Sequence, residues 1–464
     1  MKTKSFLLLL FFAFTTIVCL NGCSATYKGE TLEEAVKDVC RKDYGVEDVQ
    51  VKVIGKTLGV YLPLERLFSS NLEAFNSEDP EASFEDLFKF NEEAMERVED
   101  VLFSISRVIL STNRQIDFYV LKAVETKSSG IELVLTGYVQ DMKYVRFWNI
   151  SVNEYRKRFL QDLSINRTVI WRRVVRDFFE HVGQFNLIDL ISYYFVEDIE
   201  LKDISPFFYS QLVESEYKKE LRYDIKELKT KPISEREVLV YVRLREFFEP
   251  RDANDTNEFL FKNGVEHEYL FVIQAGKTAY KIRQVIPFYY VDENKMLRKL
   301  DFPEELKVYN NIDTWDSEFD LEEVFMGSFI SRQMTKRAQG MIMQDPEVMS
   351  LFFSAKVDFG FIESNDVEGA SPQFFVEVEL ADKDGAVIEY AQAENNVKKN
   401  IYLLLQKVFD EFCVVLNGYE FNEFESIELL LSPISQPISI SQNEINNYRN
   451  TVVDKRDISS LIDF

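Results

Sequence analysis

The chain has 464 residues, and its 79 acidic side chains outnumber its 54 basic ones, so the formal net charge at pH 7 is −25. A negative charge of this size keeps a chain soluble and argues against non-specific binding to nucleic acid. The 40 Phe and 22 Tyr residues, with only 16 Gly and 11 Pro, exclude a disordered stalk and indicate a globular chain of two or three domains.

The first 23 residues have the three parts of a secretory signal. Lys2 and Lys4 precede an apolar run over residues 6–20, and the run leads into the tetrapeptide Leu-Asn-Gly-Cys, whose cysteine is Cys23. The run is shorter than the roughly 20 residues that a membrane span needs. The pattern therefore predicts an exported chain whose signal is cleaved.

The end of this signal resembles the Leu-x-Gly-Cys box of bacterial lipoproteins, and the resemblance covers residues 1–23 only. It implies that residues 1–22 are removed and that Cys23 receives lipid, palmitate included, as the first mature residue. Ser24, in place of an aspartate, implies the outer membrane rather than the inner membrane. The alternative is an ordinary cleaved signal with a chance cysteine.

Two amphipathic helices are expected in the residues that follow. The first runs from Thr31, with Glu34 at the spacing of a capping box, to a stop at Gly45. The second covers residues 91–112, where apolar residues recur every three or four positions and form a wide stripe. Such a stripe favours a helix that faces the protein core.

The triplet Gly-Lys-Thr, which ends a phosphate-binding loop, occurs at residues 55–57 and 276–278. Such a loop also needs a glycine five positions before the glycine of the triplet, so that consecutive N–H groups can face the phosphates. Gln50 and Phe271 occupy those positions. Apolar and polar residues alternate on both sides of each triplet, which predicts two β-hairpins and no nucleotide site.

After the hairpin at residues 55–57, another hairpin over residues 116–139 completes a first domain, residues 23–148, in the order α-β-β-α-β-β. Between Glu65 and Asp100 the chain has 12 acidic and 3 basic residues, a density typical of a solvated loop or an exposed helix face. A calcium site is the alternative, but the spaced Asp and Asn residues of a calcium loop are missing.

Residues 149–303 have a different order of elements and predict a central α+β domain. Helical patterns at residues 171–182 and 185–195 come first, and strands at residues 236–248, 268–276 and 278–291 follow. This order resembles the nuclear-transport-factor-2-like superfold, whose cone-shaped sheet packs against helices. That superfold has many unrelated functions, so the resemblance implies no particular activity.

Residues 304–431 predict a third α+β domain. Two strands are expected around the turn at residues 382–385, then a helix over residues 394–416 that Gly418 ends, then a strand from Ser426. Hairpin, helix and strand follow in the same order after Val49, which raises the idea of a repeated module. Residues 432–464 are polar and are expected to form an extended arm.

The fold class expected from these patterns is α+β, with several domains in which antiparallel sheets pack against long amphipathic helices. Cys40 and Cys413 either form a disulfide, which an exported chain permits, or remain two buried thiols on helix faces. His181 and His267 lack the spacing of a zinc site, and no nucleophile motif is present, so no metal, cofactor or catalytic residue is expected.

One stretch reverses the acidic character of the chain and is a candidate contact patch. Between residues 154 and 176, basic side chains outnumber acidic ones. The patch would meet anionic lipid headgroups or an acidic partner, or it would pair within the chain with the acidic segment around Glu92 and Glu93. Its basic residues are Arg156, Lys157, Arg158, Arg167, Arg172, Arg173 and Arg176.

The sequence favours a non-catalytic envelope protein that is attached to the membrane through lipid on Cys23 and that binds or scaffolds other envelope proteins. The first alternative is a ligand-binding module with an aromatic pocket in the central sheet. The second is an envelope hydrolase whose carboxylates carry no recognisable motif. A deep aromatic pocket would favour the first alternative, two facing buried carboxylates the second, and an exposed apolar patch the scaffold.

Overall fold

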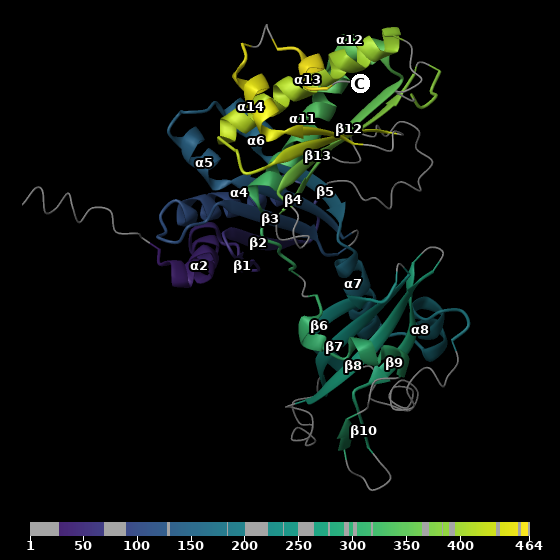
Figure 1. The fold of residues 1–464 in the computed structure, drawn as a ribbon. Coiled ribbons are helices and arrows are strands. Elements are labelled where there is room, and N and C mark those ends of the chain that lie inside the picture. Colours follow the sequence, from purple (N-terminus) through teal and green to yellow (C-terminus); the bar gives the residue numbers. More distant parts are fainter. Residues whose placement is uncertain are drawn as a thin grey trace, which may run out of the picture.

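The computed structural model describes residues 27–68, 90–127, 130–182, 184–199, 221–234, 236–248, 264–276, 279–291, 297–299, 304–316, 319–363, 371–382, 384–388, 395–432, 437–452 and 456–462. The multi-domain α+β fold is confirmed for this part of the chain. The predicted signal, Cys23 and most of the acidic segment lie outside it. Figure 1 shows three parts, which we name the N-terminal unit (residues 27–165), the central module (167–315) and the C-terminal unit (326–462).

The N-terminal unit is a sheet in the order β1-β2-β3-β4-β5, in which β2 and β3 run parallel and the other neighbours antiparallel. The predicted order α-β-β-α-β-β is present as far as β4. Strand β5 then pairs with β4, so the unit ends at Ile165, later than the boundary expected near residue 149. Its elements are η1 Gly29–Thr31, α2 Leu32–Tyr44, β1 Gln50–Ile54, β2 Thr57–Leu64, α4 Glu92–Ile109, β3 Phe118–Glu125, β4 Ile131–Tyr138, α5 Val139–Arg146, α6 Val152–Arg158 and β5 Leu160–Ile165.

Local sequence explains where the first two long helices begin and end. Gly45 follows α2 with a φ of 71°, the left-handed conformation that the predicted stop requires. Asn91 begins α4, where its side chain accepts a hydrogen bond from the Ala94 N–H at 3.1 Å. The capping box predicted at Thr31 is wrong, because Thr31 ends a 3₁₀ turn and its hydroxyl donates to the Lys28 carbonyl instead.

Helices α2 and α4 cover one face of the N-terminal sheet. Cys40 on α2 and Val101 and Ile105 on α4 are fully buried in the core beneath them, with Val60 and Leu121 of the sheet. The apolar stripe that predicted the second helix is therefore the stripe that faces the sheet. Burial of each such side chain stabilises the fold by about 1.5–3 kcal/mol.

The C-terminal unit is a sheet in the order β12-β13-β14-β15, with β13 and β14 parallel and the other neighbours antiparallel. Helices α11 and α13 pack on one face of it, and Figure 1 shows them above the strands. Its elements are α11 Met326–Gln344, α12 Pro346–Leu351, β12 Ser354–Ile362, β13 Gln373–Ala381, α13 Asn395–Tyr419, β14 Ser426–Ser432, β15 Ile438–Ser441, α14 Gln442–Asn450 and η8 Ile458–Ser460.

The two units repeat one topology. In each, a helix precedes an antiparallel hairpin, a second helix crosses to a parallel strand, and a last strand pairs antiparallel with that one. In the C-terminal unit the hairpin begins one strand earlier than the sequence pattern indicated, because β13 pairs with β12 before it and not with the segment after the turn. The turn at residues 382–385 leads only to an isolated bridge between Ala381 and Val387.

Two further expectations for the C-terminal unit are wrong. Gly418 does not end α13, which runs to Tyr419, and Glu420 takes the left-handed conformation instead, with a φ of 53°. A side chain at Gly418 would lie 3.0 Å from the Arg158 guanidinium, so this glycine allows a close approach between the units. The C-terminal arm is also folded, because β15 pairs with β14 and Ile445 of α14 is fully buried.

The central module is an antiparallel sheet in the order β6-β7-β8-β9 with two helices before it, which is the order of elements that the sequence indicated. Strand β6 was not predicted, because its charged residues break the alternation around a bulge between Ile225 and Glu227. Its elements are α7 Arg167–His181, α8 Leu187–Tyr194, β6 Leu221–Pro232, β7 Glu237–Phe248, β8 Val265–Ala275, β9 Tyr280–Pro287, β10 Tyr289–Val291, β11 Leu297–Lys299, η4 Glu304–Tyr309 and η5 Ile312–Thr314.

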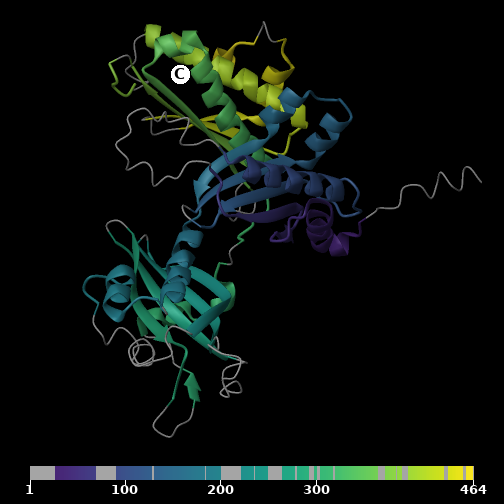
Figure 2. The ribbon, with the colours of Figure 1, turned by 180° about the vertical axis from the view of Figure 1, so that it is seen from behind.

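Helix α7 joins the central module to the N-terminal unit. Its first turn packs on the N-terminal sheet through Val169, beside Val120 and Val124. Its later turns enter the core of the central module through Val175 and Phe178. Figures 1 and 2 show this helix running from one body into the other, so a single regular element fixes the connection.

The chain returns from the central module across the open face of the N-terminal sheet. Leu321 and Phe319 pack so closely on β2 that a side chain at Gly59 would lie 2.5 Å from Leu321. The first Gly-Lys-Thr triplet takes part in this contact: the Lys56 N–H donates to the Glu323 carboxylate at 2.9 Å, and Thr57 accepts from a backbone N–H at 2.9 Å. The hairpin predicted there is confirmed, and its turn holds the returning chain.

Candidate functional site

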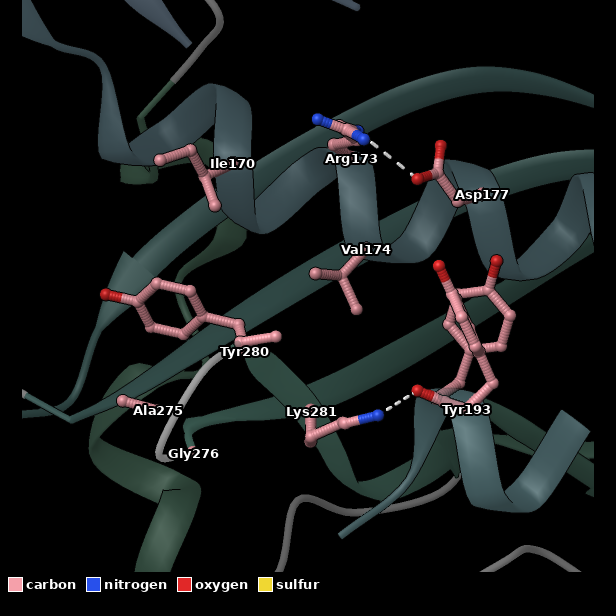
Figure 3. A pocket seen from close by; sticks show the side chains of 11 residues that line it. Ile170, Arg173, Val174, Asp177, Tyr193, Ala275, Gly276, Tyr280 and Lys281 are labelled. Atoms are coloured by element: carbon pink, nitrogen blue, oxygen red, sulfur yellow. Dashed lines mark hydrogen bonds and ion pairs between the residues drawn. The ribbon is translucent and has the colours of Figure 1, made fainter. Parts of the chain in front are cut away.

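A pocket of about 680 Å³ lies on the central module, between α7, the end of α8 and the turn that joins β8 to β9. This volume is in the range of small-molecule sites. Figure 3 shows the side chains that face it. The lining residues are Ile170, Arg173, Val174, Asp177, Tyr193, Tyr194, Ala275, Gly276, Ala279, Tyr280 and Lys281.

The helical period of α7 divides its side chains between the core and the pocket. Val175 and Phe178 face the sheet and are fully buried, while Ile170, Val174 and Asp177 line the pocket. One helix therefore forms both a rigid support and one wall of the site.

The second Gly-Lys-Thr triplet contributes its glycine to the opposite wall. The Gly276 N–H donates to the Ala279 carbonyl at 2.9 Å and closes the hairpin turn, as predicted. A side chain at Gly276 would lie 2.7 Å from that oxygen, so the turn requires glycine. Lys277 and Thr278 lie outside the described residues.

Both cations of the pocket already have partners. Arg173 Nε lies 3.2 Å from Asp177 Oδ2 on the next turn of α7. The Lys281 ammonium donates to the Tyr193 carbonyl and lies 5.4 Å from the centre of the Tyr193 ring. Figure 3 shows both interactions along the rim. The site is therefore polar without carrying a large uncompensated positive charge.

Three tyrosines supply the aromatic surface of the pocket. Tyr193 is 60% exposed, and Tyr280 packs edge-on against Trp171 with 6.3 Å between ring centres. Tyr194 is buried, its hydroxyl bonds His181 Nδ1, and burial raises the pKa of the phenol. Tyr193 and Tyr280 thus present ring surface to a ligand, while Tyr194 is fixed in the wall.

A second cluster of titratable groups lies on the face of the central sheet that α7 covers. Glu246 and His267 approach to 3.9 Å between carboxylate and imidazole, and Tyr223 and Tyr269 lie beside them. Burial raises the pKa of Glu246 to about 7 and lowers that of His267. Glu246 Oε2 accepts no hydrogen bond from a described residue.

A partly buried ionic network joins the N-terminal and C-terminal units. Arg158 Nη1 lies 2.9 Å from Asp141 Oδ1, and Arg158 Nε lies 3.0 Å from Glu154 Oε1. The Tyr419 hydroxyl donates to Asp141 Oδ2 at 3.2 Å, across 278 residues of sequence. Burial raises the pKa of Asp141, and Arg158 opposes that rise.

Helix α11 completes this network from the C-terminal side. Arg337 pairs with Glu411 at 2.7 Å and with Glu154 at 3.4 Å, and Gln333 donates to the Arg158 carbonyl at 2.7 Å. We name the set Asp141, Glu154, Arg158, Gln333, Arg337, Glu411 and Tyr419 the joint. Its charged groups pair with one another across the two units, although Gln333 Oε1 and Arg337 Nε have no hydrogen-bond partner among the described residues, so its role is to hold the two units together.

The predicted basic patch is not one surface. Arg158 belongs to the joint, and the fully buried Arg172 donates to the Asp316 carbonyl at 2.6 Å. Arg173 lines the pocket, Arg176 is half-buried on α7, and Arg156 and Lys157 are exposed. Pairing within the chain does occur, but with other partners than those expected, since Glu93 pairs with Arg97.

The cysteines and histidines have structural surroundings. Cys40 and Cys413 are free thiols buried in different cores, so the possible disulfide is not formed. The rings of His181 and Phe185 stack with 4.6 Å between their centres, and His267 is largely buried. No group of three or more possible metal ligands gathers among the described residues. None of the helices described combines the length and hydrophobicity that a bilayer crossing requires.

Comparisons with protein-family models, with curated proteins and with solved structures gave no significant match.

An aromatic pocket in the central sheet was one alternative expected from the sequence, but the residues of the pocket and of the joint were not predicted, and the reason is the same for both. The pocket combines side chains near residues 173, 193 and 281, and the joint combines side chains up to 278 residues apart. A local signal existed only for the pocket, in the paired tyrosines at residues 193 and 194 and the glycine turn at residue 276.

Proposed function

We propose that this chain is a lipid-anchored envelope protein that binds a small ligand, without catalysis, in the pocket of the central module. The observation that supports this proposal is the pocket itself, which combines Tyr193 and Tyr280 ring surface with the polar groups of Arg173, Asp177 and Lys281. An apolar lining with a few placed polar groups is typical of binding sites.

The pairing of the cations limits the chemical class of the ligand. Asp177 compensates Arg173, so among the described lining residues only Lys281, which donates to a backbone carbonyl, keeps a positive charge that no carboxylate of the lining offsets, and a multiply charged phosphate would meet little net positive charge there. Arginine, lysine and aspartate still offer donors and acceptors to hydroxyl groups, and tyrosine rings offer an apolar face. A neutral, hydroxyl-rich ring such as a sugar has both complementary features.

Calorimetric titration of the whole chain with defined mono- and disaccharides tests this function. Saturable binding is expected, and Tyr280→Ala and Lys281→Ala should each weaken it about tenfold or more, since a hydrogen bond to a charged group contributes about 1.5–3 kcal/mol. Arg283→Ala is the matched control, because Arg283 follows on the same strand and pairs with Glu237 outside the pocket. Equal weakening by the control, or no saturable heat, would contradict the proposal.

The anchor needs a separate test. Lipid on Cys23 should place the mature protein in the detergent phase of a partition experiment, and mass spectrometry of its N-terminal peptide should find the modified cysteine. Cys23→Ala should leave the signal uncleaved or release the chain into the aqueous phase. An unmodified peptide beginning at or after Cys23 would mean that the protein is secreted without a lipid anchor.

A further inference from the structure

The turn between α5 and α6 exposes an unusual amount of apolar surface. Trp148 is 88% exposed, Phe147 is 69% exposed and Val152 is 51% exposed. We name these three residues the apolar tip. Exposed large apolar side chains that lie together mark interaction sites more often than single ones do.

The backbone at the tip is held in a conformation that disfavours tryptophan. Trp148 has a φ of 61°, in the left-handed region. Its N–H donates to the Val145 carbonyl at 3.2 Å, and the Asn149 N–H donates to the Tyr144 carbonyl at 2.8 Å. These two bonds form the helix stop in which glycine is usual at this position. The turn thus presents an indole to solvent where glycine would be easier to accommodate.

Exposed cations surround the tip. Lys143 and Arg146 lie on α5 before it, and Arg156 and Lys157 lie on α6 after it. No ion pair joins any of these four side chains to a described residue, whereas the acidic neighbours Asp141 and Glu154 are both held by Arg158. The surface at the tip is therefore locally cationic, although the whole chain is strongly acidic.

We propose that the apolar tip inserts into the interface of a bilayer that contains anionic lipid. Tryptophan favours the membrane–water interface, and exposed cations are attracted to anionic headgroups. The inference rests on the proposed export and anchoring of the chain, which bring it to a membrane.

The position of the tip agrees with the position of the proposed anchor. Helices α2 and α5 lie toward the same side of the N-terminal unit in Figure 1 and, by their colours, in Figure 2. Tyr27 lies before α2, and its N–H donates a hydrogen bond to the Ser111 carbonyl. Three residues lie between Cys23 and Tyr27, so the chain takes four steps of at most about 3.6 Å each, and lipid on Cys23 would be attached within about 14 Å of Tyr27. Anchor and tip can therefore meet one membrane surface together.

Vesicle binding of the mature chain with Cys23→Ala tests the tip without the anchor. The chain has three tryptophans, of which Trp315 is buried and Trp171 half-buried, so a change of emission on binding reports mainly on Trp148. We expect a blue shift with vesicles of phosphatidylglycerol and phosphatidylcholine, and none with phosphatidylcholine alone. Because this variant carries no lipid, its result does not depend on whether Cys23 is modified in the native protein.

Variants separate the apolar and the ionic contributions. Trp148→Gly lacks the reporting indole, so co-sedimentation with the vesicles measures its binding, which should be about tenfold weaker than that of the parent chain because one aromatic side chain no longer enters the bilayer. Arg156→Gln should weaken vesicle binding about fivefold. Adding salt should weaken the binding of this variant less than it weakens the binding of the parent chain. Phe353→Ala is the matched control, because Phe353 is 68% exposed on the C-terminal unit.

Two results would overturn the proposal. One is binding to anionic vesicles that Trp148→Gly leaves unchanged. The other is the absence of any vesicle binding together with cross-linking of the tip to an envelope protein through a photoreactive group at residue 148, which would assign the surface to a protein partner.

Discussion

The joint and the apolar tip are built from the same short stretch of chain and have opposite surroundings. Residues 139–158 contribute Asp141, Glu154 and Arg158 to the joint, where each charge has a partner. The same residues place Phe147 and Trp148 in solvent, among cations that have no ion pair with the described chain. A run of basic residues in sequence is therefore not one functional unit.

The difference shows that burial and the partners within the fold decide the role of a charged side chain in this stretch. At the joint, Asp141 is 1% exposed, and the cost of removing it from water is offset by Arg158 and by the Tyr419 hydroxyl. At the tip, Arg156 and Lys157 keep their water and remain able to meet a partner. Removal of one charge should therefore be costly for folding at the joint and nearly neutral for folding at the tip.

The largest expected effect comes from breaking the joint. Arg158→Met should lower the free energy of unfolding by about 3–5 kcal/mol, because it leaves Asp141 buried without its cation. Adding Asp141→Asn should recover part of this loss. Arg156→Met is the control and should change stability by less than about 0.5 kcal/mol. Urea titration of the three variants measures this, and equal effects of Arg158→Met and Arg156→Met would contradict the comparison.

Glu246 provides a buried carboxylate with no arginine or lysine ion pair to a described residue and with His267, at 3.9 Å, beside it. Its pKa is about 7 in the folded chain against 4.5 for an ordinary glutamate, so the folded state binds the proton more tightly. The stabilisation that Glu246 contributes is therefore complete below pH 4.5 and is lost as the pH rises through 7. The loss is about 3 kcal/mol in the free energy of unfolding.

Glu246→Gln should remove that loss, and unfolding curves between pH 5 and pH 8 would detect it. His267 acts in the opposite direction, because burial lowers its pKa and its contribution is lost as the pH falls. His267→Gln in the same series separates the two groups. A pH dependence that Glu246→Gln leaves intact would show that other groups dominate.

A smaller effect of opposite sign is expected at the tip. Trp148→Gly should stabilise the chain by about 1 kcal/mol, because glycine adopts a φ of 61° without steric cost. Glu420→Gly is a matched control, since Glu420 has a φ of 53° at the end of α13. Thermal unfolding should show a gain for both variants, while only Trp148→Gly should lose vesicle binding. A loss of stability in Trp148→Gly would mean that the indole has contacts that support the fold.

The smallest effect concerns the cysteines. Cys40 and Cys413 are free and lie in separate cores, so a reductant should leave the unfolding midpoint unchanged. Thiol counting in denaturant should find both residues reactive. A midpoint that falls on reduction would indicate a disulfide between them.

Local patterns in the sequence predicted the two long N-terminal helices and the hairpins around residues 55–57 and 276–278, because periodicity is decided by neighbours in the chain, whereas the hairpin expected around residues 382–385 is wrong. The apolar stripe of α4 and the alternation around residues 55–57 both correspond to elements of the fold. Strand β6 and the helix α14 were missed, because charged or polar residues dominate them while only a few apolar residues such as Ile445 reach the core. Tertiary packing overrode local composition in both.

The candidate site was less predictable than the fold. The tyrosines and lysine of the pocket come from α8 and β9, and nothing local indicates that these elements converge with α7. The basic run was visible, but which arginines would be buried depended on Asp141, 17 residues from Arg158, and on Asp316, 144 residues from Arg172.

Hydrogen exchange of the whole chain, with and without a saturating saccharide, tests most directly whether the central module is the binding part. The account predicts that exchange slows in α8 and in the turn between β8 and β9, and that the joint is unaffected. Exchange that is unchanged in these two elements, or that slows at the joint instead, would contradict it.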